Sequence, residues 1–312
     1  MLNGKRSDLR AMPSIDAHVH LYPEDLNRAP GVWATAHGER HWAMLCTRVR
    51  KSGRAVQGFP SVDELLHAMD EAGVDRAVLQ GWYWENHATC VWQNRFYAAC
   101  VKAHPDRLSA FATLHAGAGR EAVISEVRRV KAEGFCGIGE LSPHSQGFSV
   151  EDETWRAVLE LAGELRLPVN LHVTEPEGRN YPGKIATPLG DFVRMAKAHP
   201  ATVFILAHWG ARLPLDAEFG AEARALKNLY YDTAASPLIY PRADVREMLG
   251  QFGAERVLFG TDYPLELFPN GEGEGGAGTM RGFVDAFRAA GLGEAECAAV
   301  LGGNAARVIG LR

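Results

Sequence analysis

Two histidines separated by one residue, His18 and His20 in the segment IDAHVHLYP, carry the clearest chemical signal of the sequence. Residues i and i+2 of a β-strand point to the same side, so the two imidazoles would project together from backbones ~6–7 Å apart. That separation allows both rings to bind one metal ion, since histidine is a common metal ligand. Two core histidines satisfied by hydrogen bonds would have the same spacing, so the pair alone leaves both interpretations open.

Other side chains of metal-binding type follow short apolar runs elsewhere in the chain. They are Glu140 in GIGEL, His172 in VNLHV, His208 in FILAHWG and Asp262 in RVLFGTD. If each run is a strand of one parallel barrel, the carboxyl ends of all these strands meet at one mouth. Independent coincidence does not account for so many ligands at strand ends, and the set therefore predicts a metal site.

The elements that would position these side chains are short apolar runs alternating with amphipathic helical patterns. The eight predicted strands cover residues 14–20, 76–81, 108–114, 137–141, 168–173, 203–208, 230–234 and 256–262. Strands that alternate with helices are typical of βαβ units and a parallel sheet. The sequence therefore predicts the α/β class, with residues 1–312 forming a single (β/α)8-barrel domain.

Two connections are longer than the others. Residues 21–60 are expected to form a long loop insertion after the first strand, and 263–278 follow the last strand and contain the run NGEGEGGAG. Long loops in compact domains are often functional, and both of these follow strands. They would therefore lie at the catalytic mouth.

Composition limits the classes of partner. The net charge is −5, and the chain has no long run of like charges, which argues against nucleic acid or an anionic membrane as the main partner. Neither an apolar signal region nor a stretch of ~18 apolar residues is visible. The five cysteines show no C-x-x-C spacing and are typical of reduced thiols. We expect a cytoplasmic protein that binds a small molecule, and a homo-oligomer is compatible with the sequence.

The order of these motifs resembles that of the amidohydrolase superfamily of TIM-barrel enzymes. The segments IDAHVHLYP, AHWG and LFGTDYP resemble its amidohydrolase-related branch, which includes non-oxidative aromatic-acid decarboxylases and lactone hydrolases. The similarity extends from Ile15 to the terminal NAARVIGL. It implies that His18, His20, His172 and Asp262 bind a metal, with His208 catalytic or a ligand of a second ion. It does not specify the substrate.

Glu140 departs from the decarboxylase pattern, in which the fourth strand does not usually offer a carboxylate. It is similar to the glutamate of TatD-type hydrolases, which would bridge two ions. Alternatively, Glu140 hydrogen-bonds a ligating histidine. Both alternatives stay open, and the expected cofactor is therefore a divalent metal, zinc, as one ion or two.

A metal site of this kind would give catalytic roles to two residues, Asp262 and His208. Zinc lowers the pKa of bound water to ~7. Asp262 can accept the proton of this water and return it to the leaving group, while His208 can hydrogen-bond the water or a developing oxyanion.

Side chains near the predicted strand ends are candidates for the substrate pocket. The predicted substrate-binding residues are Trp82, Arg179, Trp209, Arg212 and Tyr263. Aromatic side chains with a few polar groups suit a small organic substrate. Arg179 or Arg212 would pair with a substrate carboxylate, because arginine binds carboxylates through two hydrogen bonds.

We expect a metal-dependent hydrolase of a small amide, ester or lactone. Glu140 favours this reaction, because an extra carboxylate at the metal helps to generate and orient hydroxide. The alternative is a non-oxidative metal-dependent decarboxylase of an aromatic or unsaturated carboxylic acid, whose substrate the loop cations would hold. A third interpretation, from another class, is a non-catalytic barrel that binds a ligand.

Overall fold

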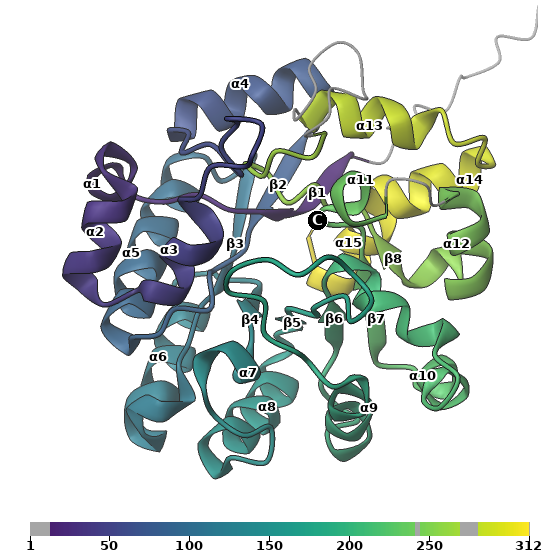
Figure 1. Cartoon of the computed structure of the whole chain (residues 1–312). Coiled ribbons are helices and arrows are strands. Elements are labelled where there is room, and N and C mark those ends of the chain that lie inside the picture. The colour runs from purple at the N-terminus through teal and green to yellow at the C-terminus, as the bar shows by residue number, and fades with distance from the viewer. Residues whose placement is uncertain (1–12, 241–243, 269–279, 312) are drawn as a thin grey trace, which may run out of the picture.

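The computed structural model describes residues 13–240, 244–268 and 280–311. Its eight strands are parallel, and each pairs with the next along the chain. They are β1 (Ile15–Val19), β2 (Arg76–Leu79), β3 (Leu108–Ala112), β4 (Gly137–Leu141), β5 (Val169–Leu171), β6 (Phe204–Leu206), β7 (Leu229–Asp232) and β8 (Val257–Leu258). The first strand and the residue after it are joined to the residues that follow β8 by backbone hydrogen bonds, from Ala17 N to Phe259 O (2.8 Å) and from His20 N to Tyr263 O (2.7 Å). The chain is therefore a (β/α)8 barrel, as predicted (Figure 1).

Most helices cover the outside of this barrel, which Figure 1 shows nearly end-on. The longer ones are α4 (Val62–Ala72), α5 (His87–Ala103), α6 (Arg120–Ala132), α8 (Glu153–Leu165), α9 (Leu189–Ala198), α12 (Val245–Phe252) and α13 (Met280–Arg288). The shorter ones are α7 (Pro143–Gln146), α10 (Gly220–Ala225), α11 (Ser236–Ile239), α14 (Glu294–Ala298) and α15 (Asn304–Ile309).

Helix α4 shows how local sequence sets these elements. Ser61 and Glu64 form a capping box at its start, and Gly73 ends it with φ 66°, a left-handed conformation that glycine adopts without a Cβ clash. Leu65 and Met69, one turn apart, are buried against the barrel.

Strand β8 is shorter than predicted. The sheet ladder stops at Leu258, whereas the apolar pattern suggested a strand to residue 262. The following residues bond to a side chain instead, since Thr261 donates to the Asp16 carboxylate through both its backbone N–H (3.0 Å) and its hydroxyl. This contact directs the chain so that Asp262 enters the mouth of the barrel with φ 68°.

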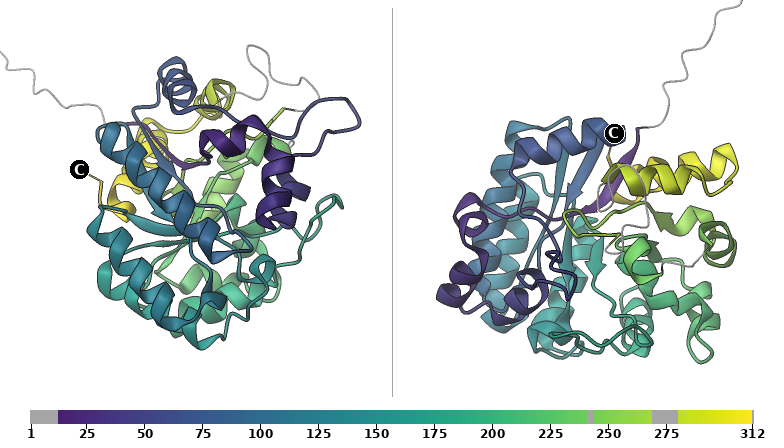
Figure 2. Two further views of the ribbon diagram at one scale, coloured as in Figure 1. Left: turned by 90° about the vertical axis from the view of Figure 1, so that its left-hand side faces the viewer. Right: turned by 45° about the horizontal axis from the view of Figure 1, so that its top comes forward.

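Residues 21–60 were expected to be a long loop, and that expectation is wrong in part. Three short helices form there, α1 (Glu24–Arg28), α2 (Pro30–His37) and α3 (Arg40–Cys46). They lie at the end of the barrel opposite the C-terminus, beside α5 (Figure 2). Trp33 of α2 stacks on Trp92 of α5 at 4.7 Å between ring centroids. The aromatic residues of the insertion thus form a small core together with Trp82, Tyr83 and Trp84 after β2, and this core stabilises helices that the sequence pattern did not reveal.

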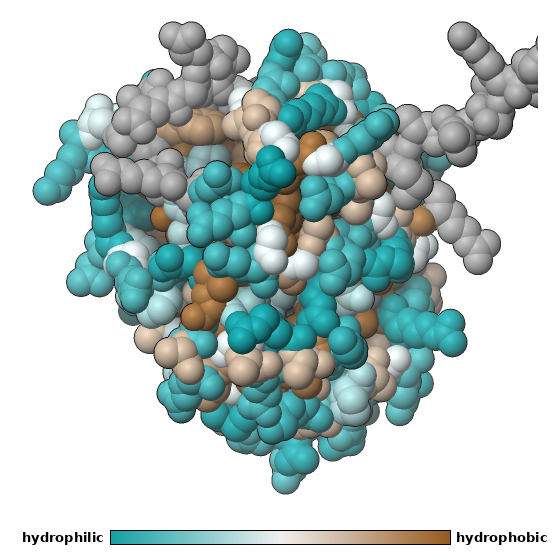
Figure 3. Space-filling model, turned by 90° about the vertical axis from the view of Figure 1, so that its right-hand side faces the viewer, coloured by the Kyte–Doolittle hydropathy of each residue, from teal (hydrophilic) through white to brown (hydrophobic). Residues whose placement is uncertain are grey.

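The opposite end of the barrel is closed by α15. Its residues Ala305 and Ile309 pack with apolar side chains from inside the strands, such as Ile15 and Phe111. Packed side chains therefore fill the barrel at this end. On the side formed by α10 and α12, hydrophilic side chains predominate and hydrophobic ones occupy small separate areas (Figure 3). None of the helices in the described residues has the length and apolar character needed to cross a bilayer. The run NGEGEGGAG, residues 270–278, lies outside the described residues.

Candidate metal centre

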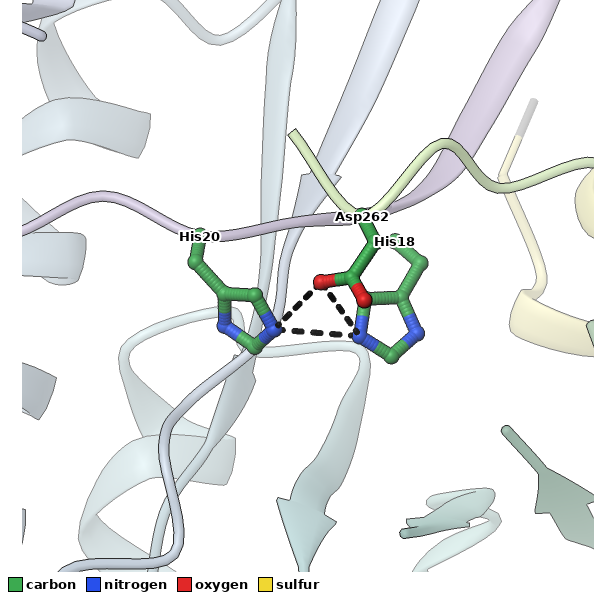
Figure 4. Close-up of side chains that lie close together, drawn as sticks. All are labelled: His18, His20 and Asp262. Atoms are coloured by element: carbon green, nitrogen blue, oxygen red, sulfur yellow. Dashed lines mark hydrogen bonds and ion pairs between the residues drawn. The ribbon is translucent and has the colours of Figure 1, made fainter. Parts of the chain in front are cut away.

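The side chains predicted to bind metal converge at the carboxyl ends of the strands. His18, His20 and Asp262 form one set, here called the first ligand group, and Figure 4 shows that they point toward one another. Glu140, His172 and His208 form the second ligand group. Within each group the candidate ligand atoms lie within 4.8 Å of one another. The two groups together are called the metal centre.

The first ligand group has the spacing of donors around one ion. His18 Nε2 and His20 Nε2 are 3.1 Å apart. Asp262 Oδ1 lies 3.9 Å from His18 Nε2 and 3.5 Å from His20 Nε2. Atoms bound ~2.0–2.2 Å from a tetrahedral ion are separated by similar distances.

Glu140 joins the two groups. Its Oε2 lies 3.7 Å from the Nε2 atoms of both His18 and His20. Its Oε1 lies 2.9 Å from His172 Nδ1 and 3.4 Å from His208 Nε2. The carboxylate thus faces both groups at once, which is the arrangement of a bridging ligand. The structure places His172 with Glu140 and His208, rather than in the first ligand group.

The imidazoles are oriented by acceptors at their other nitrogens. His18 Nδ1 lies 2.9 Å from Asp232 Oδ2, and His20 Nδ1 lies 3.0 Å from the backbone oxygen of Gln80. These oxygens accept, so each Nδ1 carries a proton and each neutral ring presents a lone pair at Nε2. Two nitrogens that face each other across 3.1 Å need a positive charge between them, either a proton on one ring or a cation bound by both. The arrangement fits a cation, and imidazole with carboxylate is a suitable donor set for a divalent transition metal.

Burial and the carboxylates set the protonation of the centre. Burial lowers the pKa of His18, but the charge and hydrogen bond of Asp232 outweigh it and raise that pKa to about 10. Burial also opposes protonation of His208, whereas the hydrogen bond and charge of Glu140 raise its pKa to about 9. Burial raises the pKa of Glu140, but the histidines around it hold this pKa well below its usual value. The centre therefore attracts positive charge, and a metal ion would compete with protons there.

Asp232 and Asp16 are two buried residues that the sequence analysis did not identify. Asp232, at the end of β7, accepts from Asn170 Nδ2 (2.9 Å) and from the backbone N–H of His208 (3.1 Å) in addition to its contact with His18. An acidic residue at the end of an apolar strand was the signal that could have revealed it. Asp16 links the first strand to the turn before Asp262 through Thr261.

Trp82 is the predicted substrate-binding residue that lies beside the metal centre. Its ring is 5.4 Å from that of His20 and stacks on Tyr83 at 4.4 Å. Tyr83, the next residue along the chain, lies 5.0 Å from His172. Trp82 and Tyr83 are here called the aromatic wall.

The structure does not bring the other predicted substrate-binding residues into this wall. Trp209 is buried. Its indole N–H donates to Ser236 (2.6 Å), and its ring contacts Phe252. Tyr263 is half-buried, and burial, with the charge of Glu64, raises its pKa to about 12. The residue after a strand does not follow the alternation of the strand, so its direction could not be read from the sequence.

The two loop arginines differ in their surroundings. Arg179 is exposed. Arg212 pairs with Glu177 (3.3 Å) and Glu175 (3.6 Å), and its guanidinium lies over the Tyr240 ring. Its charge is already balanced by these two carboxylates.

Comparison with known proteins agrees with this architecture. A family model described as amidohydrolase matches residues 15–311. None of the curated protein sequences is a significant match.

Several solved structures have a similar fold over nearly the whole chain. The 5-carboxyvanillate decarboxylase of Sphingomonas paucimobilis is 18% identical, with a TM-score of 0.72 over 96% of this chain and 100% of its own. The enzyme of the same name from Novosphingobium aromaticivorans, complexed with manganese and 4-hydroxy-3-methoxy-5-nitrobenzoic acid, is 15% identical, with a TM-score of 0.71 over 96% of each chain. A probable 2-pyrone-4,6-dicarboxylic acid hydrolase from Acinetobacter baumannii, with citric acid bound, is 16% identical, with a TM-score of 0.63 over 96% of this chain and 100% of its own. At these identities the similarity establishes the fold alone.

Proposed function

The chain belongs to the amidohydrolase family, and from that membership we propose that it is a metal-dependent enzyme that decarboxylates a small, planar carboxylic acid without oxidation. The observation that carries the choice of substrate is the aromatic wall beside the metal centre. Stacked rings offer a flat apolar surface to a planar substrate. The Trp82 indole N–H is buried and has no partner among the described residues, so it can donate to a substrate oxygen.

The structural relatives support decarboxylation over the hydrolysis expected from the sequence. Two of the three described above are decarboxylases of an aromatic acid, and one of them contains manganese. Imidazole and carboxylate ligands fit zinc, which the sequence analysis favoured, and they fit manganese as well. We propose that His18, His20, Asp262 and Glu140 hold the ion. When bound, the ion would polarise a substrate oxygen and stabilise negative charge that develops on the substrate.

The residues around this site have distinct proposed roles. In decarboxylation the bond between the carboxyl carbon and the substrate carbon breaks, its electron pair stays on the substrate carbon, and that carbon takes up a proton as carbon dioxide leaves. We assign the proton to His208 Nε2, because the other ring nitrogen lies 3.1 Å from the backbone oxygen of Ala234, which holds the ring in place. Glu140 Oε1, 3.4 Å from Nε2, stabilises the protonated form.

Hydrolysis is the second candidate, and the position of Glu140 favours it. A carboxylate that faces both ligand groups can bridge two ions, in which case His172 and His208 both act as ligands. Asp262 would then accept the proton of the attacking water. The two candidates therefore differ in the number of ions as well as in the reaction.

The test is a comparison of two substrate panels with protein loaded with zinc or manganese. Hydroxylated benzoic acids are assayed for carbon dioxide release, and lactones, esters and amides are assayed for hydrolysis. We expect carbon dioxide release that is lost with a chelator and strongly reduced in Asp262→Asn, because the amide is a weaker metal ligand than the carboxylate. Hydrolysis without carbon dioxide release, with two ions per chain, would establish the second candidate instead.

A further inference from the structure

The turn that follows β6 and begins with His208 has a backbone conformation that residues with a Cβ rarely adopt. Its five residues, 208–212, all have positive φ angles, between 48° and 61°. Only one of them is a glycine, Gly210, where a Cβ would lie 2.9 Å from the Tyr231 ring. Left-handed backbone is unfavourable for the other residue types and normally occurs at single positions rather than in runs. The turn therefore depends on surrounding contacts that hold it in place.

Buried contacts with β7 and the segment after it hold the start of this turn. The backbone N–H of His208 donates to Asp232 Oδ1 (3.1 Å), and the Trp209 indole N–H donates to Ser236 Oγ (2.6 Å). These two hydrogen bonds fix the first two residues of the turn. Its last residue, Arg212, is held by a different set of side chains.

Tyr240, which follows α11, contacts both ends of the turn. Its hydroxyl donates to Glu175 Oε2 (2.5 Å), and the same hydroxyl lies 3.3 Å from the backbone oxygen of His208. Its ring lies 5.4 Å from the guanidinium carbon of Arg212, measured to the ring centroid. The same guanidinium lies 3.6 Å from Glu175 Oε1. Glu175, Tyr240 and Arg212, here called the clamp, thus form a closed set of contacts that joins the loops after β5, β6 and β7.

The clamp differs from an ordinary surface ion pair in the burial of its carboxylate. The Glu175 side chain is 10% exposed, whereas that of Glu177, the other partner of Arg212, is 82% exposed. A buried carboxylate requires donors around it, and Tyr240 and Arg212 supply them. Exposed pairs contribute little, so we expect Glu177 to add little to the turn.

We propose that the clamp holds the left-handed turn, and with it the imidazole of His208, in the orientation that faces the metal centre. Glu175, Tyr240 and Arg212 are then positioning residues that act through His208. The proposal rests on the proposed function in one respect, that His208 takes part in the reaction. It applies to decarboxylation and to hydrolysis alike, because the direction of the ring matters whether His208 moves a proton or binds an ion. A displacement of about 1 Å at such a group can lower a rate by about 10²-fold.

Hydrogen–deuterium exchange tests the clamp without turnover. Mass spectrometry of peptides that cover residues 204–216 measures how fast the backbone amides of the turn exchange in the manganese-loaded protein. Tyr240→Phe keeps the ring beside Arg212 but removes the hydroxyl, and we expect the turn to exchange about tenfold or more faster in this variant. Glu175→Gln removes the charge that pairs with the arginine and should act in the same direction.

Tyr230 of β7 offers a matched control. Arg307 of α15 donates to its hydroxyl (3.2 Å) and lies 5.7 Å from its ring centroid, so the pair has the same chemistry at the opposite end of the barrel. Tyr230→Phe should leave the exchange of the turn unchanged. Glu177→Gln, which removes the exposed partner of Arg212, should also leave it unchanged.

Kinetic constants separate positioning from substrate binding if either substrate panel is turned over. A clamp that orients His208 predicts that Tyr240→Phe and Arg212→Met lower kcat about 10–100-fold, while KM changes less than about twofold and the metal content is unchanged. An arginine that binds the substrate carboxylate, as the sequence analysis expected of Arg212, predicts a higher KM with little change in kcat for Arg212→Met. Because the clamp acts as a unit, the Glu175→Gln, Tyr240→Phe double variant should be no slower than the slower single variant.

Any of three results would overturn the proposal. They are unchanged exchange of the turn in folded Tyr240→Phe and Glu175→Gln variants, an equally faster exchange in Tyr230→Phe, and a higher KM with unchanged kcat in Arg212→Met. Circular dichroism establishes that each variant is folded. If neither substrate panel is turned over but the turn exchanges faster in the clamp variants alone, the proposed function fails and the clamp stands, so the two failures are distinguishable.

Discussion

At the scale of single residues, each imidazole of the first ligand group is held at one nitrogen and left free at the other. His18 is held by the Asp232 carboxylate and His20 by the backbone oxygen of Gln80. The barrel therefore selects the tautomer that presents Nε2 to the metal centre. The residue type decides whether a side chain can bind a metal, whereas its hydrogen-bond partners decide where its ligand atom points.

Asp232→Asn tests the importance of such a partner. The amide is similar in shape but carries no negative charge, so it stabilises the donating form of His18 less well. We expect the affinity for zinc or manganese to fall about 10–100-fold, as is common when the partner of a ligating histidine is changed. Competition with a fluorescent chelator measures this affinity. Asp63→Asn, on the exposed start of α4, is the control and should bind metal as the wild type does.

Glu140→Gln tests the bridging position. An amide is a weaker ligand than a carboxylate, and Glu140 lies at 3.7 Å from both histidines of the first ligand group. We expect metal affinity to fall by about tenfold or more, measured by elemental analysis after dialysis against a weak chelator. Glu121→Gln, at the exposed start of α6, serves as the control. Unchanged metal content in Glu140→Gln would remove this residue from the metal centre.

At the scale of elements, buried polar contacts fix the helices to one another and to the strands. Glu126 of α6 accepts from Asn94 Nδ2 of α5 (2.8 Å), and Asn94 in turn accepts from the backbone N–H of Thr113 after β3 (2.9 Å). Arg129 donates to both oxygens of the same carboxylate, at 2.6 and 2.7 Å. The network thus joins two helices to the end of a strand.

This network predicts a pH-dependent difference in stability. Burial raises the pKa of Glu126, but the hydrogen bonds from Arg129 and Asn94 outweigh it, and the pKa lies below its ordinary value of 4.5. A depressed pKa means that ionised Glu126 stabilises the fold above pH 4.5 and that this stability is lost as the pH falls through the lower native pKa. Glu126→Gln should therefore lower the free energy of unfolding at pH 7 by about 1–2 kcal/mol.

Urea denaturation of the wild type and the variant at pH 7 and at pH 3 measures this difference. The gap between the two proteins should narrow at the lower pH. The matched control is Glu133→Gln, because Glu133 pairs with the same arginine from an exposed position and should contribute less than about 0.5 kcal/mol. A gap that widens at low pH would contradict the assigned ionisation.

At the scale of the whole molecule, the metal centre connects distant parts of the chain. Its six side chains come from the ends of β1, β4, β5, β6 and β8, which span residues 18–262. An ion bound to these side chains should therefore stabilise the folded barrel as a unit, because the unfolded chain does not hold the ligands together.

Metal removal should lower the melting temperature. A ligand at 100 times its Kd stabilises the native state by about 2.7 kcal/mol, which corresponds to a shift of several degrees. Differential scanning calorimetry with chelator, and again after zinc or manganese is added, measures the shift. The His18→Ala, His20→Ala double variant should show no metal-dependent shift. A wild-type melting temperature that changes neither with chelator nor with added metal would contradict metal binding at this centre.

Much of this architecture could be predicted from the sequence because its signals are local. The alternation of apolar runs and amphipathic helices identified all eight strands, and the positions of His18, His20, His172, His208 and Asp262 at strand ends followed from it. In a parallel barrel, carboxyl ends meet at one mouth whatever the detail of the packing. The fold class and the convergence of these side chains therefore follow from pattern alone.

Other features were decided by contacts between residues far apart in the chain. The helices of the 21–60 insertion depend on aromatic partners such as Trp92, and Asp232 gains its role from a ring 214 positions away. Arg179 and Arg212 are equivalent as residue types, and they differ because the fold leaves Arg179 exposed and places Arg212 beside Glu175 and Glu177. A loop has no repeating pattern that predicts side-chain direction. Burial and pairing, which decide whether a charge is free to bind substrate, exist only once the chain has folded.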